Sequence, residues 1–325
     1  MEPGAETLVR QPKVSVIIAT YATERMKDVQ DVVHSVLVQT LKPHEVIVAV
    51  DNHEDLFYRL RAELPDQVSV VQNNGLRGCS QTRNTAISCS TGEVIASIDD
   101  DAVAEQSWLE NLVQPFEDPG VMAVGGQSVP TWPKGRPPFW FPEEFDFVIG
   151  CTSHKKLITQ SDGQIRNVTG SNMAFRREVF ERVGLLDTRF GRTGELGVSR
   201  LAAVGGEEAE LCLRIRGNIP GAKIMFKPEA VVHHKVTPRR ATLKYEFDFC
   251  LREGNTRAML RRTLSRQHYG SMTAENTFLN RLLFKSVPQR LLHFYKASNL
   301  AQVGVITANV SLMGTGYFLG RCFRK

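Results

Sequence analysis

Three consecutive aspartates, Asp99, Asp100 and Asp101, follow a short apolar run that reads Val-Ile-Ala-Ser-Ile. In extended backbone, residues i and i+2 point to the same side, so Asp99 and Asp101 can face one site together. Unpaired carboxylates this close raise each other's pKa, and a divalent cation relieves that repulsion. All-oxygen ligation favours Mg²⁺ or Mn²⁺, which can neutralise charge that builds on a departing diphosphate. The alternative is an acidic turn that faces water.

A second acidic group, Glu207, Glu208 and Glu210, comes directly after two glycines. A carboxylate placed there can act as a general base that takes a proton from an attacking hydroxyl. A structural explanation also exists, because acids in the first turn of a helix complement its dipole and Glu210 can pair with Arg214 one turn later. That explanation accounts well for Glu207 and Glu210, which leaves Glu208 as the candidate for catalysis.

Two adjacent histidines, His233 and His234, end a β-branched run. Strand alternation points them to opposite faces, so one of them can face the aspartates while the other faces away. A purely structural role is the alternative for either ring. The basic residues that follow, Lys235, Arg239 and Arg240, are well placed in the sequence to meet phosphate oxygens.

The chain that must position these residues alternates short apolar runs with amphipathic stretches. This pattern predicts strands at residues 14–20, 45–51, 68–71, 93–99 and 121–125, and helices at 26–39, 56–64, 81–90 and 108–116. Repeated strand–helix–strand units form mostly parallel sheets with helices on both faces. We therefore expect an α/β fold.

Polar residues follow four of the predicted strands: Thr20 and Tyr21, then Asp51, then Asn73 and Asn74, then the three aspartates. Parallel strands bring their carboxyl ends to one edge of a sheet, where ligands bind. We therefore expect these side chains to share one site. The first strand is not followed by G-x-G-x-x-G, which counts against a dinucleotide-dependent oxidoreductase.

The overall charge is mildly basic, with 40 Lys and Arg against 35 Asp and Glu. An excess of this size suits nucleotides, lipid phosphates or a membrane surface, but it does not indicate nucleic acid. The polar N-terminus, residues 1–12, has no secretory signal, and the six cysteines form no C-x-x-C pair. These features predict reduced thiols and a cytoplasmic protein.

Two segments differ from the α/β pattern. Residues 132–142 are rich in Pro and aromatic side chains, and we expect a loop that either lines an acceptor site or simply packs on the surface. From residue 243 the chain is helical and basic, and residues 300–320 carry no charge. That last segment can span a bilayer, lie on its surface or be buried. We therefore expect a tail at 1–12, a catalytic domain at 13–240, and a basic helical region at 241–325 that could associate with a membrane.

Several of these segments together resemble the family 2 glycosyltransferases. The segments that carry the resemblance are residues 14–21, 35–40, 83–84, 92–101 and 206–211, in the family's order and within residues 13–237. The resemblance implies the GT-A fold, a mixed, mainly parallel nucleotide-binding sheet, and transfer of a sugar from a nucleotide diphosphate with inversion. It also implies a bound Mg²⁺ or Mn²⁺.

The resemblance assigns roles to individual residues. It implies donor binding by Thr20, Tyr21, Asp51, Arg83, Asp99 and Asp100. It implies metal binding by Asp101, His234 and Asp99, with His234 preferred to His233 because the following Lys-Val aligns with relatives. It implies that Glu208 is the base, with Glu207 as the alternative, because the family's usual Asp is replaced by Glu here.

A closer resemblance, on residues 99–105, 142–145, 206–212 and 230–236, is to archaeal N-glycosylation glucuronosyltransferases, although those relatives are strongly acidic. It implies a UDP-sugar donor, with glucuronate as one candidate, and a lipid-linked saccharide on dolichyl or polyprenyl phosphate at the cytosolic membrane face. The alternatives are transfer directly to polyprenyl phosphate, a nucleotidyltransferase, and a non-enzymatic basic module that binds membranes or nucleic acid.

Overall fold

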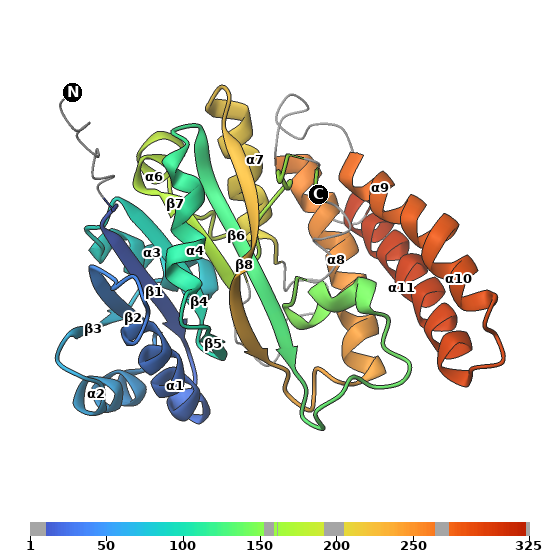
Figure 1. The fold of residues 1–325 in the computed structure, drawn as a ribbon, viewed down its shortest axis with the longest axis horizontal. Helices are drawn as coiled ribbons and strands as arrows, with labels where there is room; N and C mark the ends of the chain where they lie inside the picture. The colour runs from blue at the N-terminus through green and yellow to red at the C-terminus, as the bar shows by residue number, and fades with distance from the viewer. Residues whose placement is uncertain (1–10, 153–158, 161, 192–204, 264–272, 323–325) are drawn as a thin grey trace, which may run out of the picture.

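The computed structural model describes residues 11–152, 159–160, 162–191, 205–263 and 273–322. Helices cover both faces of a twisted sheet, and a group of C-terminal helices lies to one side of it (Figure 1). The predicted α/β class, with a mixed and mainly parallel sheet and a C-terminal helical region, is confirmed. Residues 1–10 of the expected N-terminal tail lie outside the described residues.

The sheet has the strand order β3-β2-β1-β4-β7-β6-β8-β5. Strands β1, β2, β3 and β4 are parallel neighbours, whereas β7 runs antiparallel to both β4 and β6. The strands are β1 (Val14–Thr20), β2 (Glu45–Asp51), β3 (Val68–Asn73), β4 (Val94–Asp99), β5 (Ala102–Ala104), β6 (Val121–Thr131), β7 (Asn172–Arg176) and β8 (Lys223–Lys235).

The predicted end of the fifth strand at residue 125 is wrong, because β6 continues to Thr131. Two glycines, Gly125 and Gly126, resemble a strand end in the sequence. In the structure the backbone of Gly126 passes so close to β8 and β7 that a Cβ atom there would lie 2.4 Å from the carbonyl oxygen of Ala230 and 2.4 Å from Nδ2 of Asn172. Gly126 therefore permits close approach between neighbouring strands rather than ending one.

The predicted helices are present with shifted ends. Helix α4 stops at Val113 and is followed by a short 3₁₀ turn, because Pro115 has no backbone N–H to continue the helical hydrogen bonds. The helices are α1 (Met26–Leu37), α2 (Glu54–Glu63), α3 (Cys79–Cys89), α4 (Trp108–Val113), α6 (Arg177–Val183), α7 (Glu207–Asn218), α8 (Leu243–Thr263), α9 (Thr273–Arg281), α10 (Val287–Leu291) and α11 (Ala297–Cys322). Shorter turns are η1 (Thr23–Arg25), η2 (Gln114–Glu117), η3 (Glu143–Ile149) and the π-helical η4 (Leu282–Ser286).

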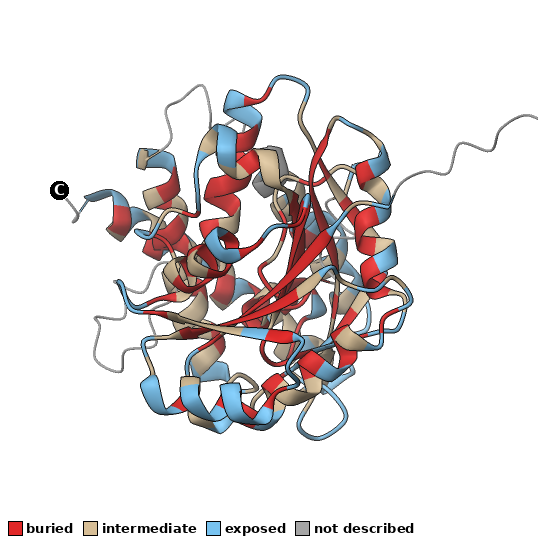
Figure 2. Cartoon of the chain, turned by 90° about the vertical axis from the view of Figure 1, so that its left-hand side faces the viewer, coloured by how far each residue is buried: buried red, intermediate tan, exposed pale blue. Residues whose placement is uncertain are grey.

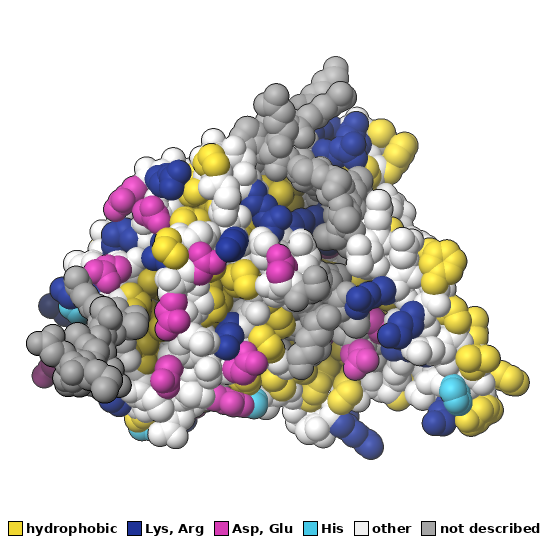
Figure 3. Space-filling view, turned by 45° about the horizontal axis from the view of Figure 1, so that its top comes forward, with side chains coloured by type: hydrophobic (Ala, Val, Ile, Leu, Met, Phe, Trp, Pro, Cys, Tyr) yellow, Lys and Arg dark blue, Asp and Glu magenta, His cyan; other side chains and the backbone are white. Residues whose placement is uncertain are grey.

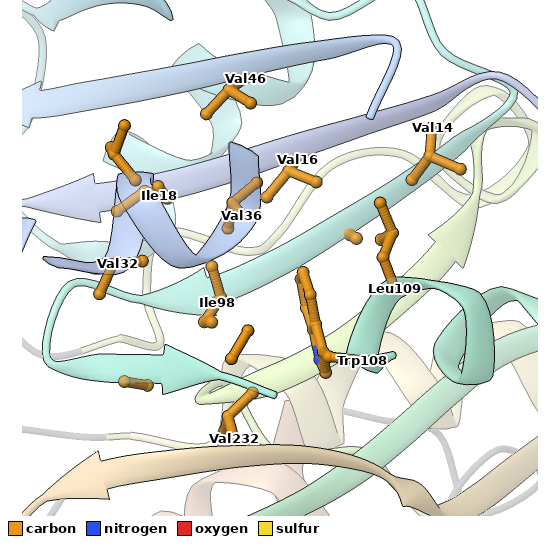
Figure 4. Packing of buried hydrophobic residues seen from close by; sticks show 14 of the residues in the cluster. Val14, Val16, Ile18, Val32, Val36, Val46, Ile98, Trp108, Leu109 and Val232 are labelled. Carbon is orange, nitrogen blue, oxygen red and sulfur yellow. The ribbon is translucent and has the colours of Figure 1, made fainter. Parts of the chain in front are cut away.

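The central strands are buried on both faces, which explains their unbroken apolar sequences. Val16 and Ile18 of β1 pack in one cluster with Val32, Val36 and Trp108 (Figure 4). Ile17, between them in the sequence, belongs to the cluster on the opposite face. Figure 2 shows this buried layer running through the sheet, with exposed residues on the outer sides of the helices. A sheet fixed on both faces is a rigid platform for the residues at its edge.

The C-terminal helices α8 and α11 pack with their backbones in contact. A Cβ atom on Gly254 would lie 2.0 Å from the carbonyl oxygen of Met313, and one on Gly316 would lie 1.9 Å from that of Leu251. Within the described residues, α11 is long and apolar enough to cross a membrane, and 28% of its most apolar stretch is buried. Whether it enters a bilayer stays a prediction, as does the domain division near residue 240.

Candidate active site

The carboxyl ends of the parallel strands meet as the sequence predicted. In the sheet register Asp99 lies opposite Ala19, next to Thr20, and Asp51 lies opposite Asn73. Asp51 accepts hydrogen bonds from Nδ2 of Asn73 and from the backbone N–H of Gly78, both at 3.0 Å. Thr20 is buried, whereas the ring of the following Tyr21 is 46% exposed. The ends of these strands thus carry one partly exposed aromatic ring, that of Tyr21. The polar side chains next to it are buried or held by hydrogen bonds.

Asp99, Asp101 and His234 form a compact cluster whose potential ligand atoms all lie within 4.8 Å of one another. Nε2 of His234 is 3.2 Å from Oδ1 of Asp101 and 3.8 Å from Oδ2 of Asp99. The short strand β5 pairs with β8 so that Ala102 lies opposite His234, which brings Asp101 beside the imidazole. This pairing joins residues that are far apart in the sequence.

The two histidines separate as strand alternation requires. His234 is 1% exposed and lies at the aspartates, whereas His233 points outward and meets Glu105 at 3.0 Å. Burial disfavours charge on His234, but Asp101 and Asp99 outweigh burial and raise its pKa well above the ordinary value. The pKa of Asp99 is held low because His234 and Arg83 outweigh the opposing effect of burial.

The donor atoms fit a divalent cation. Two carboxylates suit Mn²⁺ or Mg²⁺, and the imidazole adds a nitrogen donor that Mn²⁺ accepts more readily than Mg²⁺. Oδ2 of Asp101 is buried and accepts no hydrogen bond among the described residues, and Nη1 of Arg25, 3.0 Å away, is its ion-pair partner. Asp99, Asp101 and His234 are therefore suited to hold a metal ion.

Asp100 is not part of this cluster and forms an ion pair with Arg25, which also pairs with Asp101. The guanidinium of Arg25 also lies over the Tyr21 ring, 4.9 Å from its centroid. Burial, together with the charges of Asp101 and Asp99, raises the pKa of Asp100 to about 7 despite Arg25. Donor binding by Asp100 thus stays a prediction, while Arg25 is a neighbour that the sequence pattern did not indicate.

We call Asp99, Asp101 and His234 the metal-type cluster. Arg83 connects this cluster to Glu207 and Glu208. Its side chain is 4% exposed, and it donates to Asp99 at 2.9 Å, to Glu207 at 3.1 Å and to Glu208 at 3.3 Å. A further hydrogen bond reaches the carbonyl oxygen of Gly170 at 3.2 Å. A guanidinium can serve several acceptors at once because its N–H donors fan out in one plane. In this structure Arg83 therefore bridges acids within the protein.

The two candidate bases differ in exposure and pKa. The Glu207 side chain is 7% exposed, and that of Glu208 is 16% exposed. Burial and the charge of Glu207 raise the pKa of Glu208 to about 7, against the effect of Arg83. Glu210 instead forms the predicted structural pair with Arg214 at 2.7 Å. Glu208 thus has the greater access and a pKa suited to a base at neutral pH.

Two glycines, Gly170 and Gly150, lie so close to Glu208 and His234 that a side chain at either position would collide with them. A Cβ atom on Gly170 would lie 2.1 Å from Oε1 of Glu208, so only glycine leaves room for that carboxylate. Gly150 has a φ of +82°, and a Cβ atom there would lie 3.0 Å from Cε1 of His234. Because η3 ends at this position, the segment after the Pro-rich loop lies against the metal-type cluster.

The predicted loop at residues 132–142 is confirmed, and part of it is packed. The rings of Trp132 and Phe141 lie 4.9 Å apart and belong to a buried cluster with Ile149 and Val236. Phe139, in contrast, is 66% exposed. The loop thus has both a packed side and an exposed side, and its role toward an acceptor stays a prediction.

Comparison with known proteins places this geometry in a family. Residues 15–184 match the description "Glycosyl transferase family 2". A glucosyl-dolichyl phosphate glucuronosyltransferase of Haloferax volcanii is 35% identical over 314 residues, covering 95% of this chain and 96% of the relative. The succinoglycan biosynthesis protein ExoM of Rhizobium meliloti is 29% identical, covering 72% of this chain and 69% of ExoM.

The fold has a counterpart among solved structures. A mannosyltransferase of Pyrobaculum calidifontis, solved in complex with GDP-Man and Mn²⁺, aligns with a TM-score of 0.61 and 18% identity, covering 98% of this chain and 89% of that one. This likeness supports the GT-A fold. Together, these findings confirm the predicted resemblance: the chain is a glycosyltransferase and belongs to glycosyl transferase family 2.

Proposed function

We propose that the chain transfers a sugar from a UDP-sugar to a lipid-linked saccharide with inversion at the anomeric carbon. The observation that carries the proposal is the arrangement of Asp99, Asp101 and His234 within 4.8 Å of one another, joined through Arg83 to Glu208. One end of this arrangement suits a metal and a diphosphate. The other end offers Glu208 as a base, whose pKa of about 7 is close to neutral pH.

The donor lies at the sheet edge in this proposal. Tyr21, with Thr20 and Asp51, holds the nucleoside side, while Asp99, Asp101 and His234 hold Mg²⁺ or Mn²⁺ beside the diphosphate. A bound ion of this kind neutralises charge that develops on the leaving nucleotide. The Pyrobaculum mannosyltransferase, which was solved with both GDP-Man and Mn²⁺, supports the combination of a nucleotide-sugar and a divalent cation on this fold. Asp100 acts indirectly, by holding the Arg25 guanidinium over the Tyr21 ring.

Glu208 takes the proton of the acceptor hydroxyl as that oxygen attacks the anomeric carbon. Attack from the face opposite the nucleotide is a single displacement, which inverts the configuration. Arg83 holds the Glu208 carboxylate through Nη1 at 3.3 Å, and the backbone of Gly170 leaves space for it. The base must be ionised to accept a proton, so we expect transfer to increase as pH rises through about 7.

The proposed acceptor is a saccharide on dolichyl or polyprenyl phosphate at the cytosolic membrane face, and glucuronate is the first sugar to test. The activity named for the Haloferax relative, a glucosyl-dolichyl phosphate glucuronosyltransferase, supports both choices.

A donor panel tests the proposal. The purified chain is incubated with several UDP- and GDP-sugars in Mn²⁺, Mg²⁺ or EDTA, with a glucosylated polyprenyl phosphate as acceptor. We expect metal-dependent transfer from one UDP-sugar and a product of inverted configuration by NMR. The matched variants are Asp101→Ala, which should abolish transfer, and Asp118→Ala, an exposed acid that pairs with Lys223 away from the site. Turnover that is indifferent to EDTA would contradict the proposal.

A further inference from the structure

The charged side chains in residues 276–325 are all basic. Residues 276–325 contain seven Lys and Arg and no Asp or Glu, whereas the chain as a whole is nearly balanced at 40 to 35. A segment with only one sign of charge attracts a partner of the opposite sign. The active site does not explain this bias, because its residues come from earlier in the chain.

The same segment carries a concentration of exposed apolar side chains. Residues 291–297 are all exposed, and this run includes Leu292, Phe294 and Tyr295 at 75%, 63% and 70%. Earlier in the same segment, Leu283 and Phe284 are 56% and 79% exposed. We call the set Leu283, Phe284, Leu291, Leu292, Phe294 and Tyr295 the hairpin surface, because it covers η4, α10 and the turn into α11.

The hairpin surface covers the turn of a helical hairpin and the helical segments that lead into it. Hydrogen bonds from the backbone N–H of Leu292 to Pro288 and of Phe294 to Leu291 continue α10 into the turn. Phe284 lies in the π-helical η4, Leu291 is the last residue of α10 and Tyr295 lies in the turn that follows, so these exposed rings and side chains are brought together along one continuous segment. Exposed Lys285 and Lys296 lie at the two ends of the set. In Figure 3, hydrophobic and basic side chains gather on the flank where Figure 1 shows the C-terminal helices.

The hairpin is fixed relative to the active site. Arg290 of α10 binds both oxygens of Glu144 in η3, at 2.8 and 2.9 Å, and Oε1 of Gln302 in α11 at 2.8 Å. Gln302 in turn donates to the carbonyl oxygen of Phe139 in the Pro-rich loop at 3.1 Å. Because η3 ends at Gly150 against His234, these bonds orient the hairpin surface relative to the metal-type cluster.

We propose that the hairpin surface docks on the interface of an anionic lipid bilayer. Exposed Phe, Tyr and Leu next to Lys are the composition of interfacial helices, whose apolar side enters the headgroup region while the cations meet lipid phosphates. A two-fold dimer through this surface would place two copies of a basic, acid-free segment against each other, because such an interface pairs a surface patch with itself. A bilayer matches both the apolar area and the charge.

This inference rests on the proposed function for its purpose, which is to hold the active site at a lipid-borne acceptor. Its test uses lipid without substrate, so the two can fail separately. Binding of the full chain is measured by vesicle flotation. One set of vesicles is pure phosphatidylcholine, and in the other about a third of the lipid is phosphatidylglycerol. We expect binding to the anionic vesicles that weakens in high salt, because surface charge attraction is screened.

Two variants of the hairpin surface separate its contributions. Leu292→Ser/Phe294→Ser/Tyr295→Ser removes exposed apolar area without opening the core, and we expect vesicle binding to fall by about a hundredfold. Lys285→Glu/Lys296→Glu should reduce binding by at least about tenfold and remove the preference for anionic lipid. Tyr58→Ser, at a 59% exposed position on α2, is the matched control and should bind as the wild type does.

Three outcomes would overturn the inference. One is undiminished vesicle binding by the triple serine variant. If Phe318→Ser, at a 62% exposed position on α11, then abolishes binding, α11 is the membrane element instead. Another is a dimer in light scattering that the triple variant dissociates while lipid binding persists. The third is the absence of wild-type binding to either vesicle. If the triple serine variant loses lipid binding but still transfers sugar to a detergent-dissolved acceptor at the wild-type rate, the inference is supported and the proposed function is intact.

Discussion

Two glutamates in different parts of the molecule, Glu208 at the sheet edge and Glu246 between α8 and α11, have pKa values raised to about 7. Glu208 is partly exposed and has Arg83 and Glu207 as charged neighbours. Glu246 is completely buried, and its Oε1 accepts a hydrogen bond from Nδ2 of Asn309 at 2.7 Å. A raised pKa therefore does not by itself mark a catalytic group; access and neighbouring charges distinguish the two sites.

The physical causes of the two shifts also differ. For Glu208, burial acts together with repulsion from Glu207, so a change in its neighbours alters the pKa. For Glu246, burial acts alone against the hydrogen bond from Asn309. Oε2 of Glu246 and Oδ1 of Asn309 have no hydrogen-bond partner in the described part of the chain, so a protonated Glu246 is the form that this interior accommodates best. We expect the first glutamate to control activity and the second to control stability.

The largest expected effect is that of Glu208→Gln. The amide cannot accept a proton, so transfer should fall by about a thousandfold while UDP-sugar affinity stays unchanged. Initial rates of UDP release and calorimetric titration of the donor measure the two quantities. Glu207→Gln is the matched control and should retain most of the rate.

Two other results for this pair would change the account. If Glu207→Gln is inactive and Glu208→Gln active, the base is Glu207. If both variants stay active, the acceptor needs no base, as expected for transfer directly to an anionic lipid phosphate.

Glu246→Gln should affect stability instead. The folded state holds the Glu246 proton up to a pKa of about 7, compared with 4.5 for the free side chain, so stability falls as pH rises through this window and is lowest above it. That cost is about 3 kcal/mol at pH 8. The neutral amide avoids it, so the variant should be more stable than the wild type at pH 8 and similar at pH 4.5.

Denaturant unfolding at the two pH values tests this prediction, with the transfer rate as the second readout. An equal stability change at both pH values would show that ionisation of Glu246 is not the cause. A change in the pH dependence of transfer in Glu246→Gln would break the distinction between the two glutamates.

A smaller effect is expected for Gly170→Ala. The added methyl group would lie 2.1 Å from Oε1 of Glu208, so the carboxylate must move, and misplacement of a catalytic group on this scale costs about ten- to a hundredfold in rate. Gly205→Ala is the control because its Cβ atom would meet nothing within 4 Å. Equal rates for the two variants would show that the position of Glu208 is not critical.

The sequence predicted those parts of the site that depend on local periodicity. The strand β4 and its three aspartates, the meeting of Thr20, Asp51 and Asp99 at one edge, and the opposite orientations of His233 and His234 all follow from alternation and parallel topology. These rules operate over a few residues or over a repeated unit. They are readable without any knowledge of three-dimensional contacts.

Contacts across long sequence separations could not be predicted in the same way. Arg25 reaches Asp100 and Arg83 reaches Glu208, across 75 and 125 residues, and nothing in the spacing indicates either pair. The three-residue β5 is too short to give a period, yet it brings Asp101 to His234. The spacing of residues around Gly170 does not indicate that it makes room for Glu208, because that role comes from the position of Glu208 in space.

The central claim is that Asp99, Asp101 and His234 hold a divalent cation beside a bound nucleotide. Electron paramagnetic resonance titration with Mn²⁺ in the presence of UDP tests it without knowledge of sugar or acceptor. We predict one Mn²⁺ bound by the wild type, and loss of that binding in Asp101→Asn and in His234→Ala but not in the control His233→Ala. Unchanged Mn²⁺ binding in both cluster variants would contradict the account.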